Sequence, residues 1–187
     1  MKKICVVNHT RAAWLVASSG VLVLTLSGCS TPEPEREYTI PSTLCGMRIS
    51  PSLLEPTLPV GKKLTVKSSK AVGESSCRVV IDEELALDIT TGWHEKGTSV
   101  LNVAYAQIGA DLTEKISKDE RYTYSEEGAV GKVDCPNHSD KYRRENYELF
   151  TQFFLTDMKA KQSEIKALLL GLTKAIIASD ECTPNKA

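Results

Sequence analysis

The chain has 187 residues, with 23 basic and 24 acidic side chains and a formal net charge of −1 at pH 7. This balance excludes the basic surface that binding to nucleic acid requires. The length is sufficient for one domain with a hydrophobic core.

The first 28 residues are organised like an export signal. Lys2, Lys3 and Arg11 supply a positive flank, and an apolar stretch of 15 residues runs from Ala12 to Leu26. This stretch is shorter than the roughly 20 residues that a membrane-spanning helix needs, and small residues follow it.

The signal ends in Leu26-Ser27-Gly28-Cys29, which resembles the lipobox of bacterial lipoproteins. The resemblance implies removal of residues 1–28, acylation of Cys29 and attachment to the membrane through the lipid. The alternative is an ordinary transmembrane anchor with an incidental cysteine, which leaves the short apolar stretch unexplained. We therefore expect the protein on the extracytoplasmic face of the cell membrane, or on the outer membrane of a Gram-negative cell.

Removal of the signal changes both the charge and the cysteine count. Residues 1–28 contain three of the basic side chains and no acidic one, so the remaining 159 residues carry a formal net charge of −4. Of the six cysteines, Cys5 leaves with the signal and Cys29 takes the lipid, so four remain. An even number in an oxidising compartment indicates two disulfide bonds. The sequence does not choose among the three possible pairings. We favour Cys45–Cys77 and Cys135–Cys182, because each pair would close one terminal half of the domain onto a neighbouring strand.

The mature chain is expected to begin with a tether at 29–44, followed by a single domain at 45–187. Residues 30–41 contain three prolines and several charges, a composition that keeps a chain extended and solvated. The domain opens with a short helical turn at 50–55, where Ser50 is the expected N-cap and Pro51 the first helical residue.

Strands dominate the following segments. They are expected at 64–67, 77–81, 85–90, 99–106, 122–125, 129–134 and 147–156. The acidic connection 82–84 predicts a hairpin, and Gly128 predicts a second one in which this glycine has a positive φ. A short helix is expected at 111–118.

The clearest helix lies near the C-terminus, where Ser163 is the expected cap. Its apolar stripe has helical spacing and consists of Ile165, Leu168, Leu169, Leu172 and Ile176. Strands followed by a terminal helix indicate an α+β domain, in which an antiparallel sheet is packed by the C-terminal helix.

The sequence contains no recognisable catalytic motif, dinucleotide fingerprint or calcium loop. Cys135 and His138 have the spacing of zinc ligands, but exported thiols oxidise, so we expect neither a metal nor another cofactor. Trp93, His94 and His138 are the candidate ligand-binding residues, since an indole can anchor a partner and an imidazole can supply a polar contact.

The chain also resembles small exported lipoproteins of Gram-positive actinomycetes, a group of uncharacterised function. The resemblance covers most of 42–182 and rests on the lipobox, the terminal helix that ends at Cys182, and the segments 44–46 (LCG), 58–64 (LPVGKKL), 77–79 (CRV) and 131–136 (GKVDCP). It implies a surface-anchored domain with two disulfide bonds and no particular activity.

Three functions are compatible with these observations. The favoured one is a non-enzymatic, lipid-anchored domain that binds an envelope protein or a surface ligand. The second is an extracytoplasmic receptor for a small molecule or a metal, with Trp93, His94 and His138 near its site. The third is a hydrolase with an unrecognised site around His94.

Overall fold

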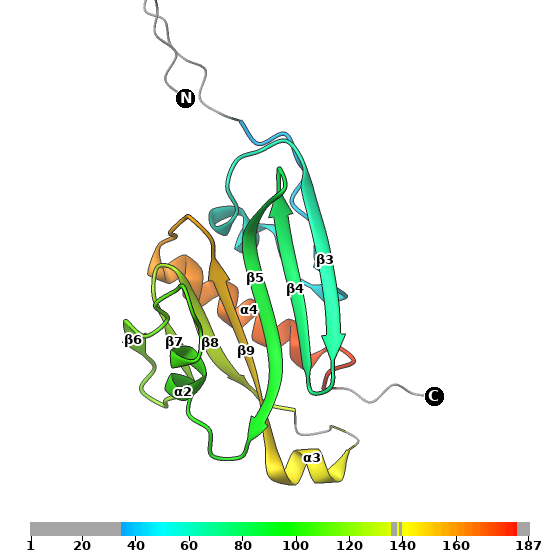
Figure 1. Ribbon diagram of the computed structural model, residues 1–187, viewed down its shortest axis with the longest axis vertical. Coiled ribbons are helices and arrows are strands. Elements are labelled where there is room, and N and C mark those ends of the chain that lie inside the picture. Colours follow the sequence, from blue (N-terminus) through cyan, green and yellow to red (C-terminus); the bar gives the residue numbers. More distant parts are fainter. Residues whose placement is uncertain (1–34, 136–137, 139, 183–187) are drawn as a thin grey trace, which may run out of the picture. The chain divides into compact units, whose positions relative to one another are not determined.

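The computed structural model of the chain describes residues 35–135, 138 and 140–182 (Figure 1). These residues belong to one compact unit, Pro34–Ala187. The expected signal peptide, the lipidation site Cys29 and the first part of the expected tether lie outside the described residues.

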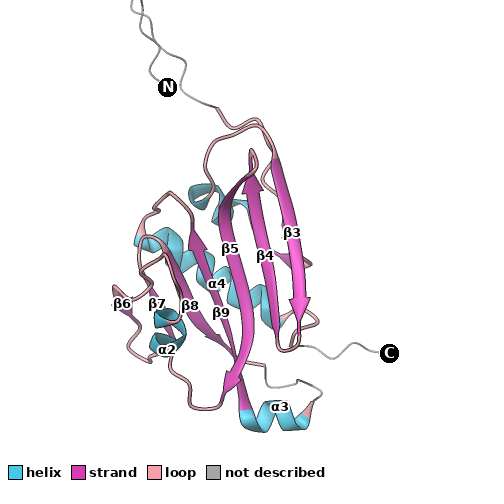
Figure 2. Cartoon of the chain, in the orientation of Figure 1, coloured by secondary structure: helices cyan, strands magenta, loops and turns pink. Residues whose placement is uncertain are grey.

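A seven-stranded antiparallel sheet with the order β3-β4-β5-β9-β8-β7-β6 forms the centre of the domain (Figures 1 and 2). Its strands are β3 (Leu64–Ala71), β4 (Glu74–Ile81), β5 (Glu84–Glu95), β6 (Lys115–Ile116), β7 (Tyr122–Tyr124), β8 (Gly128–Val133) and β9 (Tyr147–Leu155). A separate hairpin consists of β1 (Thr43–Leu44) and β2 (Met47–Arg48). The helices are α1 (Pro51–Leu54), the 3-10 turn η1 (Glu55–Thr57), α2 (Val100–Tyr105), α3 (Lys141–Asn146) and α4 (Gln162–Ile177).

Helix α4 covers one face of the sheet with the apolar stripe that its sequence predicts. All five residues of the stripe are buried, and four of them belong to the largest core cluster, together with inward-facing residues of β4, β5, β8 and β9. Residues from α1 and from the β1–β2 hairpin join the same cluster. This arrangement confirms the expected α+β fold, with its antiparallel sheet and terminal helix.

The opposite face of the sheet is covered over only part of its width. Val100, Val103 and Ala104 of α2 pack with Val130 and Phe150 of the central strands. Beside this cluster the face is polar.

Both favoured disulfide pairings are confirmed. Cys45 in the β1–β2 loop is bonded to Cys77 on β4, and Cys135 after β8 is bonded to Cys182 after α4. Each bond ties a segment outside the large sheet to that sheet or to its immediate continuation.

Two predicted elements are wrong. Residues 99–106 form helix α2 rather than a strand, because the Ser99 hydroxyl accepts a hydrogen bond from the N–H of Asn102 (3.1 Å) and caps a helix. Residues 111–118 form a turn and the short strand β6 rather than a helix. The Asp111 carboxylate binds both the N–H and the hydroxyl of Thr113, and such local bonds compete with helix formation.

Two local details also differ from expectation. Helix α4 begins one residue before the expected cap Ser163, and its N-cap is Lys161, whose N–H donates to the Glu164 carboxylate (3.0 Å). Gly128 is not among the glycines with a positive φ. Its role is to permit close approach, since a methyl group added there would overlap the carbonyl oxygen of Phe153 on β9.

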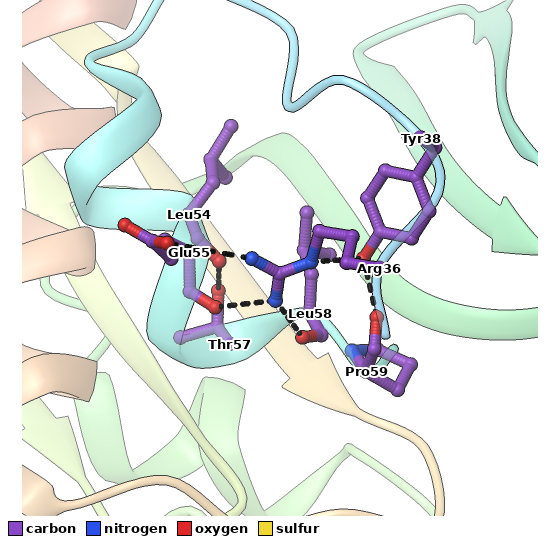
Figure 3. Close-up of polar contacts among 7 residues, drawn as sticks. All are labelled: Arg36, Tyr38, Leu54, Glu55, Thr57, Leu58 and Pro59. Carbon is purple, nitrogen blue, oxygen red and sulfur yellow. Dashed lines mark hydrogen bonds and ion pairs between the residues drawn. The ribbon is translucent and has the colours of Figure 1, made fainter. Parts of the chain in front are cut away.

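The folded domain begins earlier than the expected boundary at Cys45. The Arg36 guanidinium donates to the carbonyl oxygens of Glu55 (3.0 Å) and Leu58 (2.7 Å), and to the Tyr38 hydroxyl (3.1 Å) (Figure 3). The Tyr38 hydroxyl in turn donates to the carbonyl of Pro59. We call these contacts the Arg36 clasp. They fasten residues that the composition assigned to the tether, because backbone carbonyls of 55–59 accept the hydrogen bonds that water would otherwise accept.

Candidate functional site

A cleft of about 250 Å³ opens on the α4 face of the sheet. Strands β3, β4 and β5 form its floor, the loop Cys45–Met47 forms one wall, and residues 178–181 after α4 form another. The disulfide Cys45–Cys77 lies in its lining. The cleft is therefore bounded by elements that are far apart in the sequence.

A row of polar side chains crosses the sheet from this cleft into the core. Lys70 of β3 pairs with Ser75 of β4, Ser75 with Thr91 of β5, and Thr91 with Thr151 of β9. Because side chains alternate between the faces of a sheet, cross-strand partners share a face. The row begins at the exposed mouth of the cleft and ends at Thr151, which is completely buried.

The two inner hydroxyls of the row have long hydrogen bonds. The Thr91 hydroxyl lies 3.4 Å from the Thr151 hydroxyl, which itself lies 3.4 Å from the carbonyl oxygen of Thr90. Hydroxyl donors usually approach an oxygen to about 2.7–2.8 Å. Thr91 is only 5% exposed and lines the cleft, so it presents a weakly satisfied hydroxyl to whatever fills that space.

Opposite charges stand on the floor and on one wall of the cleft. Lys70 belongs to the β3–β4 side, whereas Asp180 and Glu181 follow the C-terminal end of α4. Within the described residues, the side chains of Lys70 and Asp180 take part in no hydrogen bond or ion pair. The C-terminal end of a helix carries a partial negative charge, which adds to that of the two carboxylates.

Trp93 and His138, two of the expected ligand-binding residues, lie together beside this cleft. Their ring centroids are 4.9 Å apart, and the Arg143 guanidinium lies 5.2 Å from the centre of the indole. The indole N–H donates to Glu181 (3.2 Å), a residue of the cleft wall. Trp93 therefore supports the cleft from outside rather than lining it.

His94, the third expected residue, lies on the opposite face of the sheet. It belongs to β5 and not to a loop after it, so its side chain points away from that of Trp93. Its ring centroid is 5.3 Å from that of Phe150. Burial lowers the pKa of His94 below its usual value, and the Glu74 carboxylate acts in the opposite direction.

The described residues contain no group of three or more His, Cys, Asp or Glu side chains that could hold a metal ion. Cys135, one of the two residues with zinc-ligand spacing, is in a disulfide bond. In the part of the chain that the structure describes, no helix has the length and apolar character needed to cross a membrane.

Sequence reasoning missed Lys70, Ser75, Thr91 and Asp180 as candidate site residues. A signal for three of them exists, because they are polar at strand positions that face the core side of the sheet. Val79 and Leu87 show the apolar character that this side otherwise has. No local signal indicates that Asp180 lies near these strands.

Known proteins give no indication of what this cleft binds. No protein-family model, no curated protein and no solved structure matches the chain.

Proposed function

We propose that the protein is a lipid-anchored lipoprotein of the extracytoplasmic membrane face, whose domain binds an extracytoplasmic ligand in the cleft. The lipobox and the two disulfide bonds support the proposed localisation. The observation that carries the binding role is the cleft itself. Its lining contains a cation and an anion that have no partner among the described residues, and a weakly satisfied hydroxyl.

The placement of the cleft suits such a role. The Arg36 clasp and the hydrogen bond from the Glu37 N–H to the Gly61 carbonyl (2.8 Å) hold the chain near the start of β3. Lys70 lies six residues after Leu64, so about 20 Å of strand separates it from that end. The cleft, which includes Lys70 in its lining, therefore lies at the C-terminal end of β3. In Figure 1 this end of the strand is remote from the segment that leads into the domain.

The walls of the cleft are fastened covalently. Cys45 and Cys77 join its first wall to its floor, and Cys182 directly follows the second wall at Glu181. A site that is already shaped before binding loses less conformational entropy when the ligand arrives. Both disulfides therefore support a binding role in addition to stabilising the fold.

The proposed localisation is tested at Cys29. Mass spectrometry of the mature protein is expected to show an acylated Cys29 at the N-terminus, and Cys29→Ser is expected to move the protein out of the membrane fraction. An unmodified Cys29 in the membrane-bound protein would contradict the anchor.

Lysine footprinting tests the binding role, because Lys70 lines the cleft whereas Lys67 on the same strand does not. An amine-reactive reagent is applied to intact cells and to the purified, washed protein. We expect Lys70 to react several-fold more slowly in cells, and Lys67 to react at the same rate in both samples. Equal rates for Lys70 in the two samples would contradict occupation of the cleft in cells.

A further inference from the structure

We propose that the cleft binds a small zwitterion, namely a free amino acid, with its carboxylate at Lys70 and its ammonium group at Asp180. This inference rests on the proposed binding role and specifies the ligand. It follows from the two opposite charges and the hydroxyls in one lining, and from the size of the cleft.

Residues of β3 and β4 form the part of the site that would bind the carboxylate of the ligand. The Lys70 ammonium group carries three donors and no internal partner, and the Ser75 hydroxyl stands beside it on the paired strand. Hydrogen bonds from a cation to a carboxylate are shorter and stronger than neutral ones. The Ser75 hydroxyl adds a directed hydrogen-bond donor beside the Lys70 ammonium group. The two oxygens of a carboxylate can accept from both groups, whereas a simple spherical anion does not require the second donor.

Residues after α4 form the part of the site that would bind the ammonium group of the ligand. Asp180 carries an unpaired carboxylate, and one oxygen of Glu181 accepts the hydrogen bond from Trp93. The carbonyl ends of the 16-residue helix α4 point toward the same region, which makes it favourable for a cation. A ligand with one charge only would leave either this end or the Lys70 end without a partner.

The space between the ends fits a small polar molecule. Pockets for drug-sized ligands occupy about 300–1,000 Å³, and a cleft of about 250 Å³ lies below that range. The weakly satisfied Thr91 hydroxyl can bond to either the ammonium or the carboxylate group of the ligand, because a hydroxyl both donates and accepts.

The test is a titration of the exported protein with free glycine and with the L- and D-forms of common amino acids. Binding is followed by isothermal titration calorimetry and by the fluorescence of Trp93, whose indole contacts the cleft wall. The best amino acid is then compared with its N-acetyl derivative, which lacks the ammonium charge, and with its amide, which lacks the carboxylate. We expect each derivative to bind at least tenfold more weakly.

Variants locate the two ends. Lys70→Gln and Asp180→Asn are each expected to weaken binding at least tenfold. Lys67→Gln, on the same strand but outside the cleft, and Glu84→Gln, at the start of β5, are expected to change binding less than twofold. Far-UV circular dichroism of every variant checks that the fold is retained.

Three results would overturn the proposal: no amino acid binds, the two derivatives bind as well as the parent, or Lys67→Gln weakens binding as much as Lys70→Gln. If Cys29 is acylated and Lys70 is protected in cells but no amino acid binds, only the identity of the ligand is wrong. If Lys70 shows no protection in cells, the cleft is not occupied there, and the titration alone decides whether it binds an amino acid.

Discussion

The indole N–H of Trp93 donates a hydrogen bond to the carboxylate of Glu181, 88 residues further along the chain, with an N···O distance of 3.2 Å. The bond joins β5 to the turn that follows α4. The next residue, Cys182, is bonded to Cys135. The wall of the cleft that carries Asp180 is thus held at the end of α4, by a side-chain hydrogen bond and by a disulfide.

Replacement of Trp93 separates the hydrogen bond from the packing. Trp93→Phe keeps an aromatic ring but removes the N–H, and we expect the free energy of unfolding to fall by about 1 kcal/mol. Trp93→Ala also removes the ring contacts, and about 3 kcal/mol is expected for such a truncation. Urea unfolding followed by circular dichroism measures both, and an unchanged stability of Trp93→Phe would contradict a role for the Glu181 bond.

Each disulfide bond is expected to stabilise the domain. Cys45 and Cys77 are separated by 32 residues, and Cys135 and Cys182 by 47. Replacing either pair with alanine is expected to lower the free energy of unfolding by about 3–4 kcal/mol, because the unfolded chain regains loop entropy. Chemical denaturation of the two double variants provides the measurement. Alkylation of the native protein without reductant should label none of the four cysteines.

Gly128 tests the close approach of β8 to β9. Gly128→Ala is expected to lower the free energy of unfolding by about 3 kcal/mol, because its methyl group would overlap the Phe153 carbonyl oxygen. Gly73→Ala is the matched control. Gly73 has φ +80° and open space around its Cβ position, so about 1 kcal/mol of backbone strain is expected there. A smaller loss at Gly128 than at Gly73 would show that the strands can separate without cost.

Stability is expected to depend on pH through His94. Burial lowers its pKa in the folded protein, whereas the unfolded chain takes up a proton at about pH 6.5. The unfolded state therefore binds more protons as the pH falls below that value, and stability is lost until the folded pKa is passed. Above the unfolded pKa the contribution is complete.

Two variants check this assignment by unfolding measurements between pH 7.5 and the acid range. His94→Gln is expected to flatten the loss, because it removes the titrating group. Glu74→Gln is expected to extend the loss to lower pH, because it removes the carboxylate that raises the pKa of His94. An unchanged pH profile in His94→Gln would assign the dependence to another group.

If Cys29 is the proposed lipid anchor, the Arg36 clasp is expected to shorten the reach of the domain from the membrane. If the chain is free only from Cys29 to Arg36, its reach is at most about 25 Å, compared with about 50 Å for a tether that ends at Leu44. Arg36→Ala is expected to expose Tyr38 and to speed chymotrypsin cleavage after it at least tenfold. Arg48→Ala, at an exposed position of β2, is the control and should leave the rate unchanged. Equal cleavage of both variants would contradict the clasp.

Local sequence patterns predicted two kinds of element. One kind pairs with the next element along the chain, and the other has an apolar periodicity that extends over many residues. The stripe from Ile165 to Ile176 repeats over a whole helix, and one apolar face was enough to place it against the sheet. The hairpin between β4 and β5 followed from β-branched residues around an acidic turn. Residues 99–106 were wrongly predicted to form a strand, because valine and leucine occur in strands as well as in buried helices. The Ser99 cap favours the helix at this position.

The sequence by itself determined an α+β domain with a terminal helix and four cysteines that form two bonds. Strand alternation explains why it misplaced the candidate site: Trp93 and His94 are adjacent in the chain, yet they face opposite sides of β5. Only the tertiary structure decided that Lys70, Thr91 and Asp180 share one cleft. Their proximity arises from strand register and from the path of the chain after α4, and such long-range contacts leave no trace in the local spacing of residues.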